Sequence, residues 1–219
     1  MAVETIDKAI AQVEYAGLLD EKSLELFWGL DLETVLHSIG TAVLFEEFAK
    51  LIGIPINKRL LRGVLFHDIG KSEPSIQKLV LSGIIYPQGS GERRLINKHP
   101  RYGLEIIFES KLEGDVDVDA VYFHHEKWDG SGYPCGRAGE KIPLGARATI
   151  VVDSFDSLSK KRNHRPNLSV EETPEFMMKR AGTVFDSTLL NIFLANPGIW
   201  NSERYMQLDK IRSQLKQSP

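Results

Sequence analysis

Two adjacent histidines, His124 and His125, end a short apolar run and precede a loop that contains two glycines and a proline. Neutral imidazole is the commonest metal ligand in proteins. Neighbouring side chains on a helix point about 100° apart. The two histidines are therefore better placed to bind two neighbouring metal ions than to bind one tetrahedral ion together. Gly130 and Gly132 allow the chain to turn sharply and approach a ligand, and Tyr133 offers an aromatic face and a hydroxyl. Taken alone, such a pair is more often a surface or packed pair, so its interpretation depends on the rest of the chain.

Other side chains that bind metals or phosphates recur along the sequence. Glu33 and His37 are four residues apart, so both point to the same side of a helix. Asp153 lies among apolar neighbours, where a carboxylate is costly unless it is paired or bound to a metal. The remaining candidates are His67, Asp68, Lys71, His99 and Asp156. Each has a simpler alternative, as a solvated helix pair, a helix cap, a loop residue or a salt-bridge partner.

Together these residues form a set of nitrogen and oxygen ligands without thiolates, which favours iron, manganese or zinc over copper(I) or iron–sulfur clusters. A carboxylate such as Asp68 can bridge two ions, and two ions about 3.5–4 Å apart activate a hydroxide for phosphoester hydrolysis. Lys71 and the basic run from Lys160 to Arg165 would then neutralise phosphate oxygens, which arginine can do bidentately. The basic run is equally compatible with a solvated helix end.

The hydrophobic pattern predicts helices and no sustained strand alternation, so we expect an all-α fold. Gly53 and Pro55 mark the end of the second predicted helix, and Asn57 is the expected cap of the next. Prolines and glycines predict a loop-rich segment between residues 74 and 91. The predicted helices cover residues 4–16, 32–52, 58–68, 93–108, 117–125 and 144–159, followed by two or three between residues 170 and 215 that are broken at Pro174 and Pro197.

The composition limits the function classes that are open to the chain. Its 219 residues suffice for a sizeable core, and a net charge of −3 gives no basic field that would recruit a nucleic acid polymer. The apolar runs are shorter than the roughly 20 residues that cross a bilayer, and the amino-terminal segment lacks a signal-like apolar stretch. Cys135 is the sole cysteine, which excludes an internal disulfide. We therefore expect a soluble, cytoplasmic protein that binds neither a membrane nor a nucleic acid polymer.

Five motifs of the chain resemble those of the HD-GYP family, a branch of the HD-domain metal-dependent phosphohydrolases. They are His67-Asp68-Ile69-Gly70-Lys71, His99-Pro100, the stretch from His124 to Pro134, Ile142-Pro143-Leu144-Gly145-Ala146-Arg147 and Asp153-Ser154-Phe155-Asp156-Ser157-Leu158. The resemblance covers about residues 30–166. It implies a helical bundle of the HD-GYP type that hydrolyses cyclic di-GMP to pGpG or GMP, although a few members act on cyclic GMP-AMP. It also implies two or three divalent metal ions, iron or manganese first, with zinc, nickel, cobalt or magnesium as alternatives.

The resemblance implies a role for each matching position. The implied metal ligands are Glu33, His37, His67, Asp68, His99, His124, His125 and Asp153. Asp68 would bridge two ions, and Glu33 would serve a third. Asp68 and Lys71 are the implied catalytic residues, because Lys71 matches the lysine that contacts the scissile phosphate. The implied substrate-binding residues are Lys71, Gly132, Tyr133, Asp156, Arg162 and Arg165.

The chain also departs from the family pattern. Two arginines survive in Lys161-Arg162-Asn163-His164-Arg165 while the rest of that motif does not, and a different sequence after Lys71 predicts a different lid over the pocket. We expect an amino-terminal helical extension at residues 1–30, a catalytic core at 31–166 and carboxy-terminal helices at 167–219, packed as one domain. The alternatives are a catalytically weak module that signals by binding a cyclic dinucleotide, a phosphohydrolase for another nucleotide and an HD-type oxygenase. The expected protein partner is a diguanylate cyclase of the GGDEF type or a sensor protein.

Overall fold

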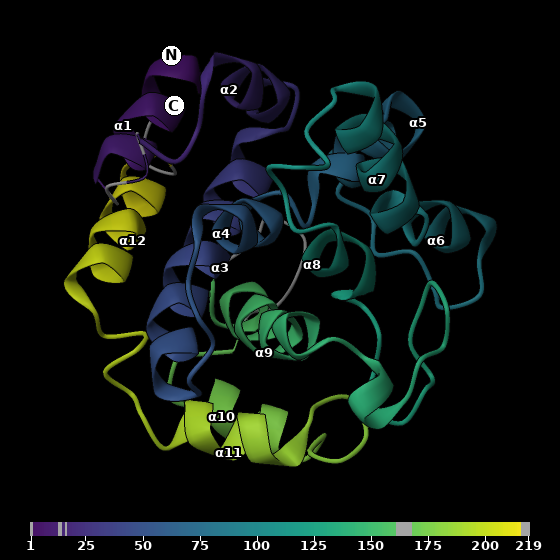
Figure 1. Cartoon of the computed structure of the whole chain (residues 1–219), viewed down its shortest axis with the longest axis vertical. Helices are drawn as coiled ribbons and strands as arrows, with labels where there is room; N and C mark the ends of the chain where they lie inside the picture. The colour runs from purple at the N-terminus through teal and green to yellow at the C-terminus, as the bar shows by residue number, and fades with distance from the viewer. Residues whose placement is uncertain (1, 13–14, 16, 161–167, 216–219) are drawn as a thin grey trace.

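The computed structural model describes residues 2–12, 15, 17–160 and 168–215 of the chain. Two long helices form its centre, α3 (Leu32–Leu51) and α9 (Leu144–Ser159), which pack against each other (Figure 1). Almost every face of α3 is buried between Thr34 and Phe45, as expected for a helix with apolar or small side chains all round. His37 lies inside this buried stretch and therefore needs a polar partner.

Shorter helices cover this central pair on the side that carries the candidate site. α4 (Lys58–Leu65) packs against α3 and against α8 (Val118–Phe123), which also contacts α9. α7 (His99–Glu109) packs against α8 and against the 3₁₀ turn η1 (Ile69–Ser72). α5 (Pro74–Leu81) lies beside η1 and α6 (Gly91–Ile96), and these elements occupy the right side of Figure 1.

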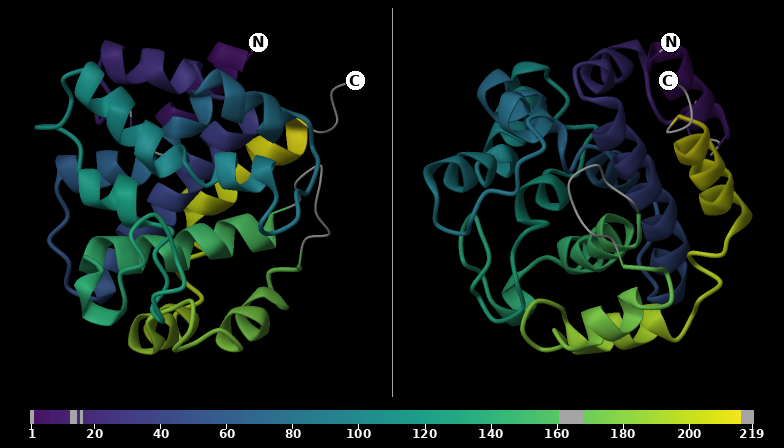
Figure 2. Two further views of the ribbon diagram at one scale, coloured as in Figure 1. Left: turned by 90° about the vertical axis from the view of Figure 1, so that its right-hand side faces the viewer. Right: turned by 180° about the vertical axis from the view of Figure 1, so that it is seen from behind.

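The two ends of the described chain meet on the opposite side. α1 (Ala2–Gln12) and α12 (Glu203–Leu215) lie side by side along α3, as the views in Figure 2 also show. α10 (Thr173–Met178) and α11 (Ser187–Leu194) pack against α9 at the bottom of Figure 1. The remaining elements are α2 (Glu21–Trp28) and the 3₁₀ turn η2 (Gly139–Lys141).

A continuous hydrophobic cluster joins the helices other than α5 and α6, with buried side chains from Ala9 in α1 to Ile211 in α12. The described part of the chain contains no strand, only an isolated bridge between Ala181 and Phe185. The predicted all-α fold is thereby confirmed. Among the helices that the structure describes, none combines the length and the apolar character needed to cross a bilayer.

The helices that the hydrophobic pattern predicts most strongly are confirmed. Predicted helix 144–159 coincides with α9, and predicted helix 32–52 differs from α3 by one residue. Asn57 caps α4 as expected, since its side chain accepts a hydrogen bond from the backbone N–H of Leu60 at 2.8 Å. α4 itself ends at Leu65, and the predicted continuation to residue 68 is a turn that leads into η1.

Several other predicted boundaries are wrong, two of them at prolines that lie in the first turn of a helix. The segment predicted as a loop between residues 74 and 91 contains α5, because Pro74 occupies the first turn, where no backbone N–H is needed. Pro174 likewise lies in the first turn of α10, which begins at Thr173. The predicted helix 93–108 is two helices, α6 and α7, separated by a turn at Asn97 and Lys98. α2 was not predicted. α1 agrees with the predicted helix 4–16 as far as Gln12, and residues 13, 14 and 16 lie outside the described part of the chain.

Candidate metal centre

Seven side chains converge in the interior between α3, α4, α7, α8 and α9. They form two groups, and within each group the ligand atoms lie within 4.8 Å of one another. The first group is Asp68, His99, His124 and His125, and the second is His37, His67 and Asp153. The fold therefore brings together seven of the expected metal ligands, although they are spread from position 37 to position 153 of the chain.

Backbone carbonyls fix the orientation of three of these histidines. His67 and His124 stand in the turns that follow α4 and α8, and His99 is the first residue of α7. In each ring Nδ1 donates a hydrogen bond to the carbonyl three residues earlier, over 2.8 or 2.9 Å; the acceptors are Val64, Ile96 and Val121. Because a carbonyl oxygen can only accept, each Nδ1 carries a proton, and Nε2 is the atom left to bind a metal once the ring is neutral. Burial lowers the pKa of His67, but the Asp68 and Asp153 carboxylates raise it above its usual value, so a metal ion at His67 would displace the Nε2 proton. Neutral imidazole in this state is a metal ligand.

The lone pairs fixed in this way face one another. Nε2 of His99 lies 3.1 Å from Nε2 of His124, and neither atom has a proton to donate. Nε2 of His67 and Oδ1 of Asp68 are buried without a hydrogen-bond partner among the protein groups. Burial lowers the pKa of His99, and burial together with the neighbouring His67 imidazole lowers that of His124, so these two rings stay neutral. Buried acceptors that face each other suit a cation between them.

Asp68 lies between the two groups. Its Oδ1 is 3.2 Å from Nε2 of His99, and its Oδ2 is 3.5 Å from Nε2 of His67, so the two oxygens face different groups. The Lys71 ammonium donates a hydrogen bond to Oδ2 from the turn η1. Burial by itself raises the pKa of Asp68, but the Lys71 ammonium and the His67 imidazole hold it well below its usual range. Asp68 is therefore an ionised carboxylate in position to bridge two cations.

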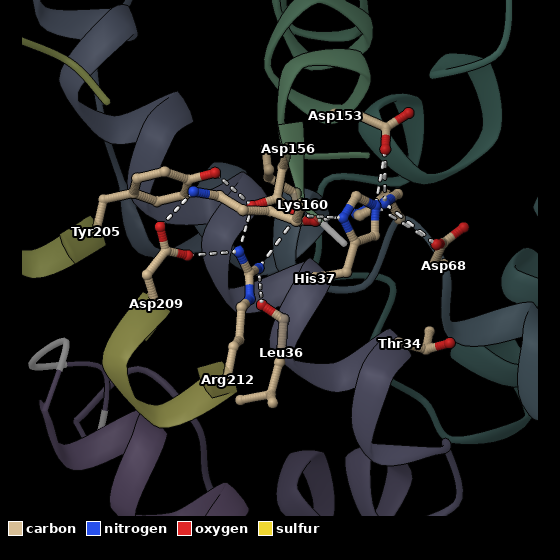
Figure 3. A network of polar contacts seen from close by, with 12 residues as sticks. Thr34, Leu36, His37, Asp68, Asp153, Asp156, Lys160, Tyr205, Asp209 and Arg212 are labelled. Carbon is tan, nitrogen blue, oxygen red and sulfur yellow. Dashed lines mark hydrogen bonds and ion pairs between the residues drawn. The ribbon is translucent and has the colours of Figure 1, made fainter. Parts of the chain in front are cut away.

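The second group is organised around His37. Its Nε2 lies 2.8 Å from Oδ1 of Asp153, and its Nδ1 donates a hydrogen bond to Oδ2 of Asp156 at 2.6 Å. Figure 3 shows the ring of His37 between these two carboxylates, with Asp68 nearby. Burial raises the pKa of Asp153, yet hydrogen bonding to His37 and the charges of the nearby imidazoles keep it below its usual range. A cation that is shared by Nε2 and the Asp153 carboxylate fits this arrangement.

A cavity of about 100 Å³ opens onto both groups and is lined additionally by Lys71, Arg93 and Tyr133. The ring of Tyr133 stacks on that of His125, with ring centres 4.7 Å apart and planes at 29°. Gly132 permits this stacking, because a Cβ on Gly132 would lie 2.3 Å from the backbone N of Lys127. The expected substrate residue Tyr133 therefore lies at the cavity, whereas Gly132 shapes the loop behind it.

Two predicted site residues lie elsewhere. Glu33 belongs to neither ligand group and lines a neighbouring cavity that also contains Lys71. Asp156 was expected to contact the substrate, but it is 1% exposed. Its carboxylate accepts hydrogen bonds from His37, Tyr205 and Arg212. In the part of the chain that the structure describes, three protein donors thus occupy this carboxylate, and a contact with the substrate stays a prediction. The predicted Arg162 and Arg165 lie outside the described residues.

Two further residues at the site were not predicted from the sequence, Arg93 and Glu126. Arg93, on α6, lines the cavity beside Lys71, but an arginine in a polar segment gives no signal in the sequence. Glu126 directly follows the histidine pair and is 1% exposed; its carboxylate accepts hydrogen bonds from the backbone of Cys135 and Arg137 at 2.6 and 3.0 Å. Glu126 holds the loop that carries Tyr133. Its position directly after two histidines is the one feature of the sequence that could have indicated a role at the site.

Buried imidazoles and carboxylates on a helical scaffold form a cluster that suits a divalent metal centre of the histidine–aspartate type. The chain belongs to the HD domain family, whose family model matches residues 54–189. The 3'3'-cGAMP-specific phosphodiesterase 2 of Vibrio cholerae is 32% identical over 80% of this chain and 35% of its own length. A cyclic di-GMP phosphodiesterase of Pseudomonas aeruginosa is 29% identical over 83% of this chain and 44% of its own length. The chain thus spans less than half the length of these relatives.

A solved structure can also be compared with the whole chain. The crystal structure of a cyclic GMP-AMP specific phosphodiesterase of V. cholerae aligns with 100% of this chain and 54% of that protein. The sequence identity is 18% and the TM-score is 0.48.

Proposed function

We propose that the chain is a metal-dependent phosphodiesterase that opens a cyclic dinucleotide, with cyclic di-GMP as the substrate and pGpG or GMP as the product. The observation that carries the proposal is the position of Asp68 between two histidine groups, with the Lys71 ammonium bonded to one of its oxygens. Pairs of metal ions about 3.5–4 Å apart are used for in-line displacement at phosphorus. The names of the two relatives, which refer to cyclic dinucleotides, support the same substrate class.

We propose two divalent ions, one held by each ligand group, with Asp68 shared between them. When bound, they would supply a nucleophile from water at neutral pH and polarise the phosphate oxygens. The position of Glu33 outside both groups supports two ions over three.

The spacing of His99 and His124 bears on the identity of the metal. Their Nε2 atoms are 3.1 Å apart. This distance is near the ~3.0 Å edge of a six-coordinate site with bonds of about 2.1 Å. It is shorter than the ~3.4 Å edge of a tetrahedral zinc site with bonds of the same length. The spacing therefore supports a six-coordinate metal over tetrahedral zinc, and among such metals we propose iron or manganese.

The other cavity residues have separate tasks in phosphodiester hydrolysis. Lys71 donates to a non-bridging phosphate oxygen, where its charge stabilises the negative charge that develops in the transition state. Arg93 offers two parallel N–H donors to a phosphate. Burial raises the pKa of the Tyr133 phenol, so its hydroxyl keeps its proton and donates to the substrate, while its ring shields His125 from water.

A second cavity of about 460 Å³ adjoins the metal cavity, and the two share Lys71, Arg93 and Ile96. Its wall combines apolar side chains of residues 79–86 with Glu33. Oε1 of Glu33 and Nε of Arg93 are buried without a protein hydrogen-bond partner. We place one nucleotide of the substrate in this cavity, with its phosphate toward the two cations and its base toward Glu33.

The Glu33 carboxylate gives this cavity a preference among bases. Guanine presents two neighbouring N–H donors on its Watson–Crick edge, which the two oxygens of a carboxylate accept together. Adenine presents an acceptor beside one amino group and would set that acceptor against a carboxylate oxygen. We therefore propose that the substrate contains guanine, which includes both cyclic di-GMP and 3'3'-cGAMP.

The test follows the products of three cyclic dinucleotides. Protein purified without oxygen and loaded with ferrous iron or manganese is incubated with cyclic di-GMP, 3'3'-cGAMP or cyclic di-AMP, and the linear products are separated by chromatography. We expect turnover of the guanine-containing substrates and its loss in Asp68→Asn, together with lower metal content. Asp119→Asn is the matched control, because Asp119 is an exposed aspartate at the start of α8. No turnover of any substrate, or full turnover by Asp68→Asn, would refute the proposal.

A further inference from the structure

His37 differs from His67, His99 and His124 in having its Nδ1 held by a side chain. It donates to Oδ2 of Asp156 at 2.6 Å, while its Nε2 faces the ligand group. A carboxylate that accepts the Nδ1 proton fixes the plane of the ring and raises the basicity of Nε2 as a metal ligand. The orientation of His37 therefore depends on the position of the Asp156 carboxylate.

Helix α12 holds that carboxylate. Tyr205 donates its hydroxyl to Oδ1 of Asp156 at 2.7 Å. The Arg212 guanidinium donates to both oxygens, from Nη1 to Oδ1 at 2.9 Å and from Nη2 to Oδ2 at 3.1 Å. Nη2 of Arg212 also donates to the backbone carbonyl of Leu36 at 2.7 Å. Arg212 thus contacts both the partner of His37 and the turn of α3 that carries His37, as Figure 3 shows.

A glycine in the middle of α3 makes room for this contact. A Cβ on Gly40 would lie 2.5 Å from Nη2 of Arg212 and 2.6 Å from Oδ1 of Asp156. Both distances are too short for any side-chain carbon, so a larger residue at this position would push the pair away from the helix. Glycine weakens a helix interior relative to alanine, and the approach of Arg212 to α3 gives a structural reason for its presence.

The charges of this network compensate one another inside the protein. Burial raises the pKa of Asp156, but the Arg212 guanidinium and His37 hold it below its usual range, so the carboxylate is ionised. Asp209 of α12 accepts a hydrogen bond from Arg212 at 3.1 Å and another from Lys160, directly after α9. Two carboxylates and two cations thereby join α12 to α9 at the position of Asp156.

We infer that α12 is part of the metal centre, and that Arg212 and Tyr205 are positioning residues which set the affinity of the His37–His67–Asp153 group for a divalent cation. The inference rests on the proposed metal-dependent function and adds an element that the ligand motifs do not contain. Asp68, His99, His124 and His125 make no hydrogen bond to α12 among those described, so the effect is confined to one of the two groups.

The experiment is a titration of metal-free protein with Mn²⁺, with free Mn²⁺ followed by electron paramagnetic resonance. We expect Arg212→Met to keep one site at its original affinity and to weaken the other about 10- to 100-fold, the range found when partners of metal-binding histidines are removed. Lys210→Met is the matched control, because Lys210 lies exposed on the same helix. It removes the same charge and should leave both affinities unchanged.

Tyr205→Phe removes only the hydroxyl that contacts Asp156 and should weaken the same site by a smaller factor. If circular dichroism shows that Arg212→Met does not fold, the Mn²⁺ affinities of Tyr205→Phe test the inference in its place. Two unchanged affinities in the folded Arg212→Met protein, or equal weakening of both sites, would overturn the inference. Wild-type protein that binds no Mn²⁺ would instead refute the proposed function itself.

Discussion

Replacing His124 by leucine should change the stability of the protein in opposite directions with and without metal. In the metal-free protein, Nε2 of His124 is a fully buried acceptor that lies 3.1 Å from another acceptor, Nε2 of His99. Leucine is similar in size and has no such atom, so the substitution removes a desolvation cost of about 1–3 kcal/mol. It also removes the hydrogen bond from Nδ1 to the Val121 carbonyl, which is worth about 1 kcal/mol. The metal-free variant should therefore be more stable than the wild type by roughly 0–2 kcal/mol.

Bound metal reverses which of the two proteins is the more stable. A ligand at 1,000 times its dissociation constant stabilises the native state by about 4.1 kcal/mol for each site. The variant loses one ligand of the first group, and with it most of this stabilisation at that site. At saturating Mn²⁺ the wild type should therefore be the more stable protein, by roughly 2–4 kcal/mol.

Urea unfolding followed by circular dichroism measures both differences, once in the presence of a chelator and once in excess Mn²⁺. Asp119→Asn, an exposed substitution on the helix that precedes His124, serves as the control, and its stability relative to the wild type should be the same with and without metal. A His124→Leu protein that is clearly less stable than the wild type in the chelator would contradict the description of His99 and His124 as opposed acceptors.

Two further predictions concern base selection and acid stability. Glu33→Gln replaces two acceptors by an acceptor and a donor, a pair that matches adenine, so the ratio of kcat/KM for cyclic di-GMP to that for cyclic di-AMP should fall about tenfold or more. Unchanged metal content in this variant would separate base recognition from metal binding. Asp20 has its pKa lowered to about 2 by the backbone N–H of Ser23 and by Arg62. Because the folded pKa lies below the ordinary value of 3.8, the carboxylate adds stability at neutral pH that is lost as the pH falls through this interval. The difference in urea stability between the wild type and Asp20→Asn should therefore shrink from pH 3.8 toward pH 2.

The long central helices could be predicted because their hydrophobic patterns are continuous. α5 could not, because its start depends on Glu73, whose carboxylate accepts from the backbone N–H groups of Ser75 and Ile76, and on a proline in the first turn. The break between α6 and α7 was also missed, since apolar residues continue at helical spacing across the turn. At these positions hydrogen bonds at the helix ends determine where a helix begins or stops, and the spacing of apolar residues does not indicate them.

The ligand set could be named from the sequence only through the resemblance of its motifs, because spacing alone does not bring α3 and α9 together. The role of Asp156 could not be recognised in this way. Its partners Tyr205 and Arg212 follow it by 49 and 56 residues, outside every motif. Arg93 could not be recognised for a similar reason, since its position at the cavity depends on the packing of α6 against α5.

The hydrogen bonds from Nδ1 to backbone carbonyls divide the ligands into two kinds with different mutational tolerance. At positions 64, 96 and 121 the acceptor is present whatever side chain is encoded, so three imidazoles keep their direction through any change there that preserves the helix end. His37 differs, because its Nδ1 donates to a side chain, and a single substitution of Asp156 removes that acceptor. Loss-of-function variants outside the ligands themselves should therefore be concentrated around His37 and be sparse around the other three rings.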